Sequence, residues 1–241
     1  MLRQPRLDIP DLLHHVMVRG IERRVIFTDK PERSLTMIHL HTSKIFGDDL
    51  TKAGCNLPAA GNGNAWNWFA HRVTLMRKKC VIVMEEASRY ALIFTGLKKN
   101  DFAGFDQVLR SRIIAEASWL CDLPHPGPNE QLIAAVARQC SSTIWSQGLD
   151  RSVQAHIRQV ADEMEYFVKY RFERLPESAE EEYALGRPLN DTLRKRGGEK
   201  DYFYPQKRWR ESLLALLQPQ ISGNVRNVVN LTDFRKGRGN D

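Results

Sequence analysis

Basic residues gather at three places in the sequence, and their side chains are the first candidates for ligand chemistry. The three groups are Arg77, Lys78 and Lys79; Lys98 and Lys99; and Arg194, Lys195 and Arg196. Clustered lysines and arginines neutralise phosphates and release the counterions bound to them, so we expect these groups to contact DNA or RNA. The alternative is that the lysines line a solvated sheet edge and prevent aggregation there.

The first two basic groups flank apolar runs that we predict to be neighbouring strands. If those strands pair antiparallel, both groups lie at the same end of a sheet. Three side chains from the preceding segment, Trp66, Trp68 and His71, could then stack on bases beside them. The alternative is that the tryptophans belong to the hydrophobic core. The sequence leaves both interpretations open.

Two histidines at a spacing of two residues, His39 and His41, form another candidate group. On a strand both imidazoles would point to the same side, where they could bind one divalent metal ion.

The carboxylates of Glu85 and Glu86 fall in a predicted turn, and those of residues 180–182 fall in a predicted connector, so we expect solvent around them. The sequence has no glycine-rich phosphate loop, no GxSxG and no HExxH. We therefore predict no complete catalytic site and no cofactor.

The composition is that of a globular protein, with 42% hydrophobic and 27% charged residues in a chain of 241. No apolar run approaches the ~20 residues of a membrane span, and the first residues lack the apolar stretch of a signal peptide. The four cysteines include no CxxC pair, which argues against a zinc or redox site. We expect a cytoplasmic protein without a membrane partner.

Positive charge is concentrated at the C-terminal end of the chain. The net charge is +7, and residues 194–241 alone carry eleven basic and five acidic residues. Residues 37–193 are nearly neutral, with eighteen basic and nineteen acidic residues. The basic end is interpreted either as a phosphate-binding surface or as a solvated tail.

The strands and helices that we expect around these residues indicate an α+β fold. We expect a central antiparallel sheet at about residues 37–96, followed by a mainly helical C-terminal half. Residues 37–46 alternate apolar and polar side chains, which is typical of a half-buried strand. The runs at 73–76, 80–84 and 90–96 are rich in β-branched and aromatic residues.

Helical spacing of apolar residues begins after this sheet. It predicts a helix at about residues 102–117, which the prolines of residues 124–128 must end. The longest periodic stretch covers residues 150–175, where Asp150 or Ser152 could be the N-cap. We divide the chain into three parts: residues 1–36, residues 37–123 with the sheet and a helix, and residues 124–241 with the other helices and the basic end.

The first part carries a specific set of residues. They are Pro5 to Asp8, His14 to Gly20, Arg23 to Asp29, and Glu32 with Arg33. This string resembles the N-terminus of REP-associated tyrosine transposases, which belong to the single-tyrosine HUH class. The resemblance covers about a seventh of the chain.

The resemblance implies a single-strand DNA nickase that serves the transposition of a mobile element. In such enzymes two histidines hold Mg²⁺ or Mn²⁺, the metal polarises the scissile phosphate, and a tyrosine on a helix attacks it. In this sequence the resemblance assigns the metal to His39 and His41 and the nucleophile to Tyr166 or Tyr170. The spacing departs from the family, because His39 follows Phe27 by only 12 residues.

The rest of the chain, from about Met37 onward, shows a second resemblance. The residues that carry it are Ile38 to Lys44, Trp66 to His71, Arg77 to Cys80, Arg89 to Phe94, Leu97 to Phe102, Asp150 to Val153, Glu165 with Tyr166, and Leu189 to Thr192. They resemble an uncharacterised bacterial family, a domain of unknown function, and imply no known activity. Our leading hypothesis is therefore a non-catalytic intracellular protein associated with nucleic acid. The alternative is a divergent or degenerate transposase-type nickase, and the sequence indicates no oligomeric state.

Overall fold

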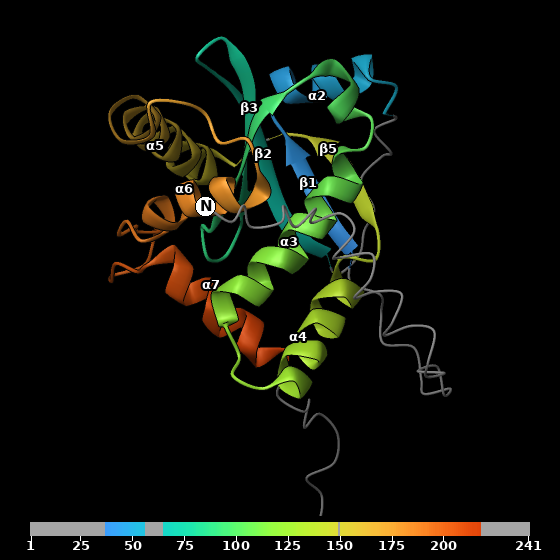
Figure 1. Cartoon of the computed structure of the whole chain (residues 1–241), viewed down its shortest axis with the longest axis vertical. Coiled ribbons are helices and arrows are strands. Elements are labelled where there is room, and N and C mark those ends of the chain that lie inside the picture. The colour runs from blue at the N-terminus through green and yellow to red at the C-terminus, as the bar shows by residue number, and fades with distance from the viewer. Residues whose placement is uncertain (1–36, 56–64, 149, 218–241) are drawn as a thin grey trace, which may run out of the picture.

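The computed structural model describes residues 37–55, 65–148 and 150–217 (Figure 1). Its strands are β1 (Met37–Thr42), β2 (Ala65–Leu75), β3 (Lys78–Glu85), β4 (Ala91–Leu97) and β5 (Thr143–Gln147). Its helices are α2 (Lys44–Lys52), α3 (Phe105–Cys121), α4 (Pro126–Gln139), α5 (Arg151–Phe167), α6 (Ala179–Asn190) and α7 (Pro205–Ala215). A 3₁₀ helix, η1 (Lys99–Phe102), precedes α3, and a π-helical turn, η2 (Val168–Phe172), follows α5. The transposase-like residues 1–36 lie outside the described residues.

A five-stranded sheet in the order β4-β3-β2-β1-β5 forms the centre of the fold. The α+β class and the central sheet are confirmed, and β2, β3 and β4 pair antiparallel as predicted. The sheet as a whole is mixed, however, because β1 pairs parallel with both β2 and β5. Parallel neighbours need long crossover connections, and here α2 lies between β1 and β2 in the chain.

Two segments near β1 differ from their predictions. The strand predicted at residues 37–46 ends at Thr42, because the next residue begins a helix: the hydroxyl of Ser43 accepts a hydrogen bond from the backbone N–H of Phe46 at 3.4 Å. Strand β5 was not predicted at all. It has only five residues and lies between two helices, so its own sequence gives little alternation to detect.

The segment predicted as an acidic connector, residues 178–188, belongs to helix α6. The hydroxyl of Ser178 caps its first turn, and the three glutamates that follow favour the positive end of the helix dipole. Pro188 lies in the last turn, where the helix is about to end. The residues that suggested a loop are therefore the ones that start and end this helix.

Helices cover both faces of the sheet. Helices α2, α3, α4 and α7 pack on one face around Trp68 and Trp209, which are fully buried. Helices α5 and α6 cover the other face at β2, β3 and β4. Helices α3 and α7 come from either side of the predicted boundary at residue 123, and this boundary stays a prediction.

The amphipathic pattern of α5 is confirmed. Its apolar stripe is buried against the sheet and consists of Val153, Ile157, Val160 and Met164. Asp150 is the N-cap, since its carboxylate accepts hydrogen bonds from the backbone N–H groups of Ser152 and Val153 at 2.8 and 3.0 Å. Of the helices that the structure describes, none has the length and apolar character that crossing a bilayer requires.

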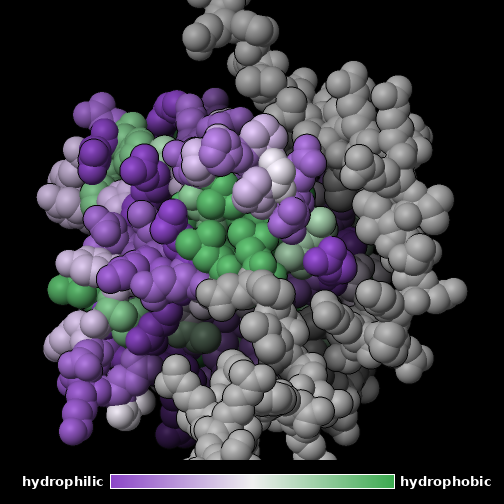
Figure 2. Space-filling view, turned by 90° about the horizontal axis from the view of Figure 1, so that it is seen from below, coloured by the Kyte–Doolittle hydropathy of each residue, from purple (hydrophilic) through white to green (hydrophobic). Residues whose placement is uncertain are grey.

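Apolar side chains along α4 and near the C-terminal ends of α3 and α7 are only partly buried. They pack against the cluster around Trp68 and are Leu123, Ile133, Ala137, Leu214, Leu216 and Leu217. Figure 2 views the molecule from below and shows an apolar patch on this side, with hydrophilic residues along its upper and left edges.

Candidate functional site

The first two basic groups lie together at one end of the sheet, which we call the sheet rim. Strands β3 and β4 pair with Lys79 opposite Leu97, so the lysines that begin β3 and those that follow β4 are neighbours. Lys79 already has a partner, because its Nζ lies 2.7 Å from the carboxylate of Asp49 on α2, which also contacts Arg72 at 3.0 Å. The exposed members of the sheet rim are Arg77, Lys78, Lys98 and Lys99.

The tryptophans do not accompany the sheet rim. Trp68 pairs with Glu85 at the other end of β3, and its indole is fully buried in the core. Trp66 is half-buried, and its indole N–H donates to the carboxylate of Glu85 at 3.2 Å. We had predicted that Glu85 is solvated in a turn, and this prediction is wrong, because its side chain is buried. His71 is half-buried, and burial lowers the pKa of its imidazole.

The third basic group lies in the segment between α6 and α7, residues 191–204, which we call the basic loop. Two backbone hydrogen bonds of 2.9 Å between Arg194 and Phe203 close this loop. The guanidinium of Arg194 is buried beneath it and donates to the carboxylate of Glu163 and to the carbonyl of Leu189, both at 3.1 Å. Arg194 therefore anchors the basic loop from inside.

The neighbouring cations lie at the surface instead. Lys195 is exposed and Arg196 is half-exposed. The Nζ of Lys195 lies 5.4 Å from the ring centroid of Tyr202, which is 65% exposed, and Tyr204 is 43% exposed. These tyrosines were not predicted to bind a ligand, although their place inside a basic segment of the sequence is a signal for it.

A second buried arginine, Arg89, lies behind the basic loop in the turn between β3 and β4. Its backbone adopts a left-handed φ of 61°, and its guanidinium donates to the hydroxyl of Ser152 at 3.2 Å. Burial lowers the pKa of Arg89, and the positive charge of Arg196 lowers it further. The positive charges of the turn and of the basic loop are therefore close enough to repel each other.

The histidine pair lies on β1, on the face that α5 and α6 cover further along the sheet. Both imidazoles point the same way, as predicted, with ring centroids 3.9 Å apart. Both contact the hydroxyl of Ser146 on β5: Nε2 of His39 lies at 2.8 Å and Nδ1 of His41 at 3.0 Å. Nε2 of His41 lies 3.4 Å from the amide oxygen of Asn67 on β2. Burial, and then the charge of His41, lower the pKa of His39.

This donor set does not suit the metal that the transposase resemblance implied. Mg²⁺ and Mn²⁺ prefer oxygen ligands, whereas the two nitrogens that converge here already bind Ser146. Within residues 37–55, 65–148 and 150–217, no group of three or more histidine, cysteine, aspartate or glutamate side chains is arranged to hold a metal ion. A metal on His39 and His41 stays a prediction that this geometry does not favour.

The candidate nucleophiles Tyr166 and Tyr170 lie at the end of α5 and in η2, with 61% and 63% of their surfaces exposed. This end of α5 meets the turn between β2 and β3, where a cavity of about 250 Å³ is lined by Thr74 and Lys169, among others. His41 pairs with Phe69, five residues before Thr74 on β2. At 3.4 Å per residue this is a separation of about 17 Å along the strand. The structure therefore does not bring the tyrosines and the histidine pair together.

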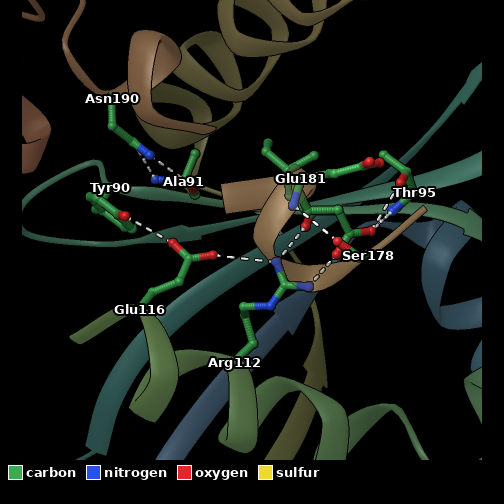
Figure 3. A network of polar contacts seen from close by, with 10 residues as sticks. Tyr90, Ala91, Thr95, Arg112, Glu116, Ser178, Glu181 and Asn190 are labelled. Carbon is green, nitrogen blue, oxygen red and sulfur yellow. Dashed lines mark hydrogen bonds and ion pairs between the residues drawn. The ribbon is translucent and has the colours of Figure 1, made fainter. Parts of the chain in front are cut away.

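A buried polar network closes the outer edge of β4 (Figure 3). The amide of Asn190 on α6 bonds both backbone groups of Ala91, at 2.7 and 2.9 Å, as a neighbouring strand would. The carboxylate of Glu182 accepts from the backbone N–H of Thr95 at 2.5 Å. Glu182 was predicted to be solvated, and it is buried because the free edge of β4 needs these acceptors.

Arg112 on α3 is the centre of this network. It donates to the backbone carbonyl of Ile93 at 3.3 Å, to Glu116 at 3.4 Å and to Glu182. The hydroxyl of Tyr90 donates to the other oxygen of Glu116 at 2.8 Å. Burial raises the pKa of Glu116 to about 7, although the guanidinium of Arg112 acts in the opposite direction. Because its members are buried, the network supports β4 rather than a ligand.

Comparisons with known proteins address both resemblances. A family model described as Domain of unknown function (DUF6933) matches residues 39–208. The resemblance of the larger part of the chain to a domain of unknown function is thereby confirmed, and no match supports the transposase resemblance of residues 1–36. No curated protein and no solved structure matches the chain.

Proposed function

The chain belongs to the DUF6933 family, whose function is unknown, and we propose on the basis of its own surface that it binds single-stranded nucleic acid through the basic loop and the start of α7. The observation that carries this proposal is the combination of exposed cations and exposed tyrosines on one short segment. The sheet rim offers cations alone, because the tryptophans lie elsewhere. The basic loop is therefore the better surface.

The charge of the proposed surface is strongly positive. Residues 191–210 carry seven basic and three acidic residues. The members of this set with exposed or half-exposed side chains include Lys195, Arg196, Lys200, Lys207 and Arg210. Such a surface attracts phosphates and releases their counterions.

The exposed rings of Tyr202 and Tyr204 supply the second requirement. Every base has a π-face, so tyrosines that protrude from a cationic surface can stack on unpaired bases without reading their sequence. The cation of Lys195 near the ring of Tyr202 keeps a phosphate-binding group beside this stacking surface. In a duplex the bases are already stacked, so this arrangement favours a single strand.

The fold gives the basic loop a defined position. Arg208 at the start of α7 binds Glu199 through two contacts of 3.2 and 2.9 Å, and its guanidinium lies 3.5 Å from the ring centroid of Phe203. A cavity of about 300 Å³ adjoins the loop at Asp191 and α7 at Gln206, and is lined further by Arg171, Phe172, Ala184, Arg187 and Pro188. Its arginines extend the positive surface toward α6.

Replacing Lys195, Arg196 and Lys200 together by glutamine should weaken binding and change its salt dependence. Each phosphate contact to a single strand contributes about −0.7 to the slope of log K against log salt, so the loss of three contacts should make the slope about 2 less negative. Fluorescence anisotropy of a labelled oligothymidine, titrated at several salt concentrations, measures this. The matched control replaces Lys78, Lys98 and Lys99 at the sheet rim, which removes the same charge. An equal loss in the control would contradict the proposal.

The alternative function, a transposase-type nickase, predicts a covalent product. We expect no adduct between the full chain and a labelled single-stranded hairpin DNA with Mg²⁺ or Mn²⁺ on a denaturing gel, because Tyr166 and Tyr170 lie far from His39 and His41. The control reactions use the Tyr166→Phe and Tyr170→Phe variants. An adduct that disappears in one of these variants would replace the binding proposal with the nickase.

A further inference from the structure

A chain of hydrogen bonds with a fixed direction runs from the turn after β3 to the edge strand β5. It begins at Glu86, whose carboxylate lies 2.9 Å from the amide nitrogen of Asn67. A carboxylate only accepts, so the amide nitrogen donates, and the amide oxygen must face His41. This oxygen also only accepts, so the hydrogen between the two groups belongs to Nε2 of His41.

The position of that hydrogen determines the role of Ser146. In its neutral form the imidazole of His41 carries one N–H, so Nδ1 is then an acceptor and receives the hydroxyl hydrogen of Ser146 at 3.0 Å. The hydroxyl has no second hydrogen, so its oxygen accepts from Nε2 of His39 at 2.8 Å. The resulting order of a serine, a histidine that accepts its proton and an amide that orients the histidine is that of an activated nucleophile.

The fold also leaves this group accessible. Ser146 lies on the edge strand, and Ser146, His39, His41 and Asn67 are all half-exposed. Within the part of the chain that the structure describes, helices α5 and α6 pack mainly on β2, β3 and β4. The ring of His41 stacks on Phe69 with centroids 4.6 Å apart, which fixes its orientation toward the hydroxyl.

We infer that Ser146 is a nucleophile that is acylated by carboxylic esters, with His41 as its general base. The oxygen of Ser146 bonds to the ester carbonyl carbon while its proton moves to Nδ1 of His41. The bond to the alkoxide then breaks, and the alcohol leaves with the proton from His41. Water attacks the acyl-serine, gives its proton to His41 and releases the acid, so that Ser146 recovers its proton. The N–H of His39 is the donor that can turn to the carbonyl oxygen as it becomes negative.

A fluorophosphonate probe tests this inference on the full chain, because it reacts only with an activated serine. The oxygen of Ser146 bonds to phosphorus, the phosphorus–fluorine bond breaks, and the proton leaves with fluoride. We expect one probe per chain, located on Ser146 by peptide mass spectrometry. The Ser146→Ala variant should lose the adduct, and the Ser141→Ala variant, which changes an exposed serine two residues before β5, should keep it.

A separate measurement tests the role of His41 as the general base. The His41→Gln variant should label at least tenfold more slowly at an unchanged thermal midpoint, and hydrolysis of p-nitrophenyl acetate should fall with it. A folded chain without label on Ser146, or a His41→Gln variant that labels at the original rate, would overturn the inference. A purely structural set of hydrogen bonds would give the first of these results.

Discussion

Replacing Arg112 with methionine is expected to lower the free energy of unfolding by about 3–5 kcal/mol, because removing one member of a buried ion pair leaves an uncompensated charge. The side chain of Arg112 is 7% exposed, and that of its partner Glu182 is 11% exposed. Methionine has a similar length, so the loss reports the charge and the hydrogen bonds more than a cavity. Urea unfolding followed by circular dichroism measures it.

Two further variants separate this effect from ordinary surface electrostatics. Arg174 pairs with Glu181 in an ion pair whose side chains are 55% and 41% exposed, so solvent screens this pair and Arg174→Met should lower the free energy of unfolding far less than Arg112→Met. Adding Glu182→Gln to the Arg112→Met variant should restore at least about 1 kcal/mol, since the unpaired charge is then removed. If Arg112→Met loses no more than Arg174→Met, the network does not support β4.

The elements that the sequence predicted are those whose signal is local. The stripe of α5 repeats every three or four residues, and Asp150 stands directly before it, so both could be identified without knowledge of their partners. The same holds for β3 and β4, whose β-branched runs are continuous. Their antiparallel pairing follows from the short turn between them.

The elements that escaped prediction depend on distant partners. Strand β5 pairs with β1 across about a hundred residues, and nothing in its five residues indicates that neighbour. Glu182 in α6 is buried because its carboxylate accepts hydrogen bonds from Arg112 and from the edge of β4. The residues next to Glu182 in the sequence give no sign of these partners. The spacing of His39 and His41 correctly placed their rings on one side, yet Ser146, which both rings contact, comes from β5.

The basic group at residues 194–196 shows the same limit within a single motif. In the sequence its three members are equivalent cations. In the fold Arg194 is buried and binds Glu163, and its backbone pairs with Phe203. This pairing presents Lys195 and Arg196 outward on the basic loop, so the first member contributes to the proposed surface by positioning the other two.

Glu116 should make the stability of the protein fall as the pH rises. Its folded pKa is about 7, against an ordinary value of 4.5, so between these values the folded state holds a proton that the unfolded state has lost. Stability therefore decreases with rising pH in this window and is constant above it. The effect is on the order of 2 kcal/mol between pH 5.5 and pH 8. His39, His71 and His156 have lowered pKa values and act in the opposite direction, so the effect must be read as a difference between variants.

The Glu116→Gln variant provides that difference, because glutamine resembles the protonated carboxyl and retains every histidine. The wild-type free energy of unfolding minus that of the variant should fall by roughly 2 kcal/mol from pH 5.5 to pH 8 in urea unfolding. The matched control is Glu181→Gln: the hydrogen bond from Arg174 lowers the pKa of Glu181 to about 2, so it is ionised throughout this window and its difference should stay constant. A constant difference for Glu116→Gln as well would mean that Glu116 is already ionised in the fold. The contact with Arg112 would then outweigh the burial of its carboxyl group.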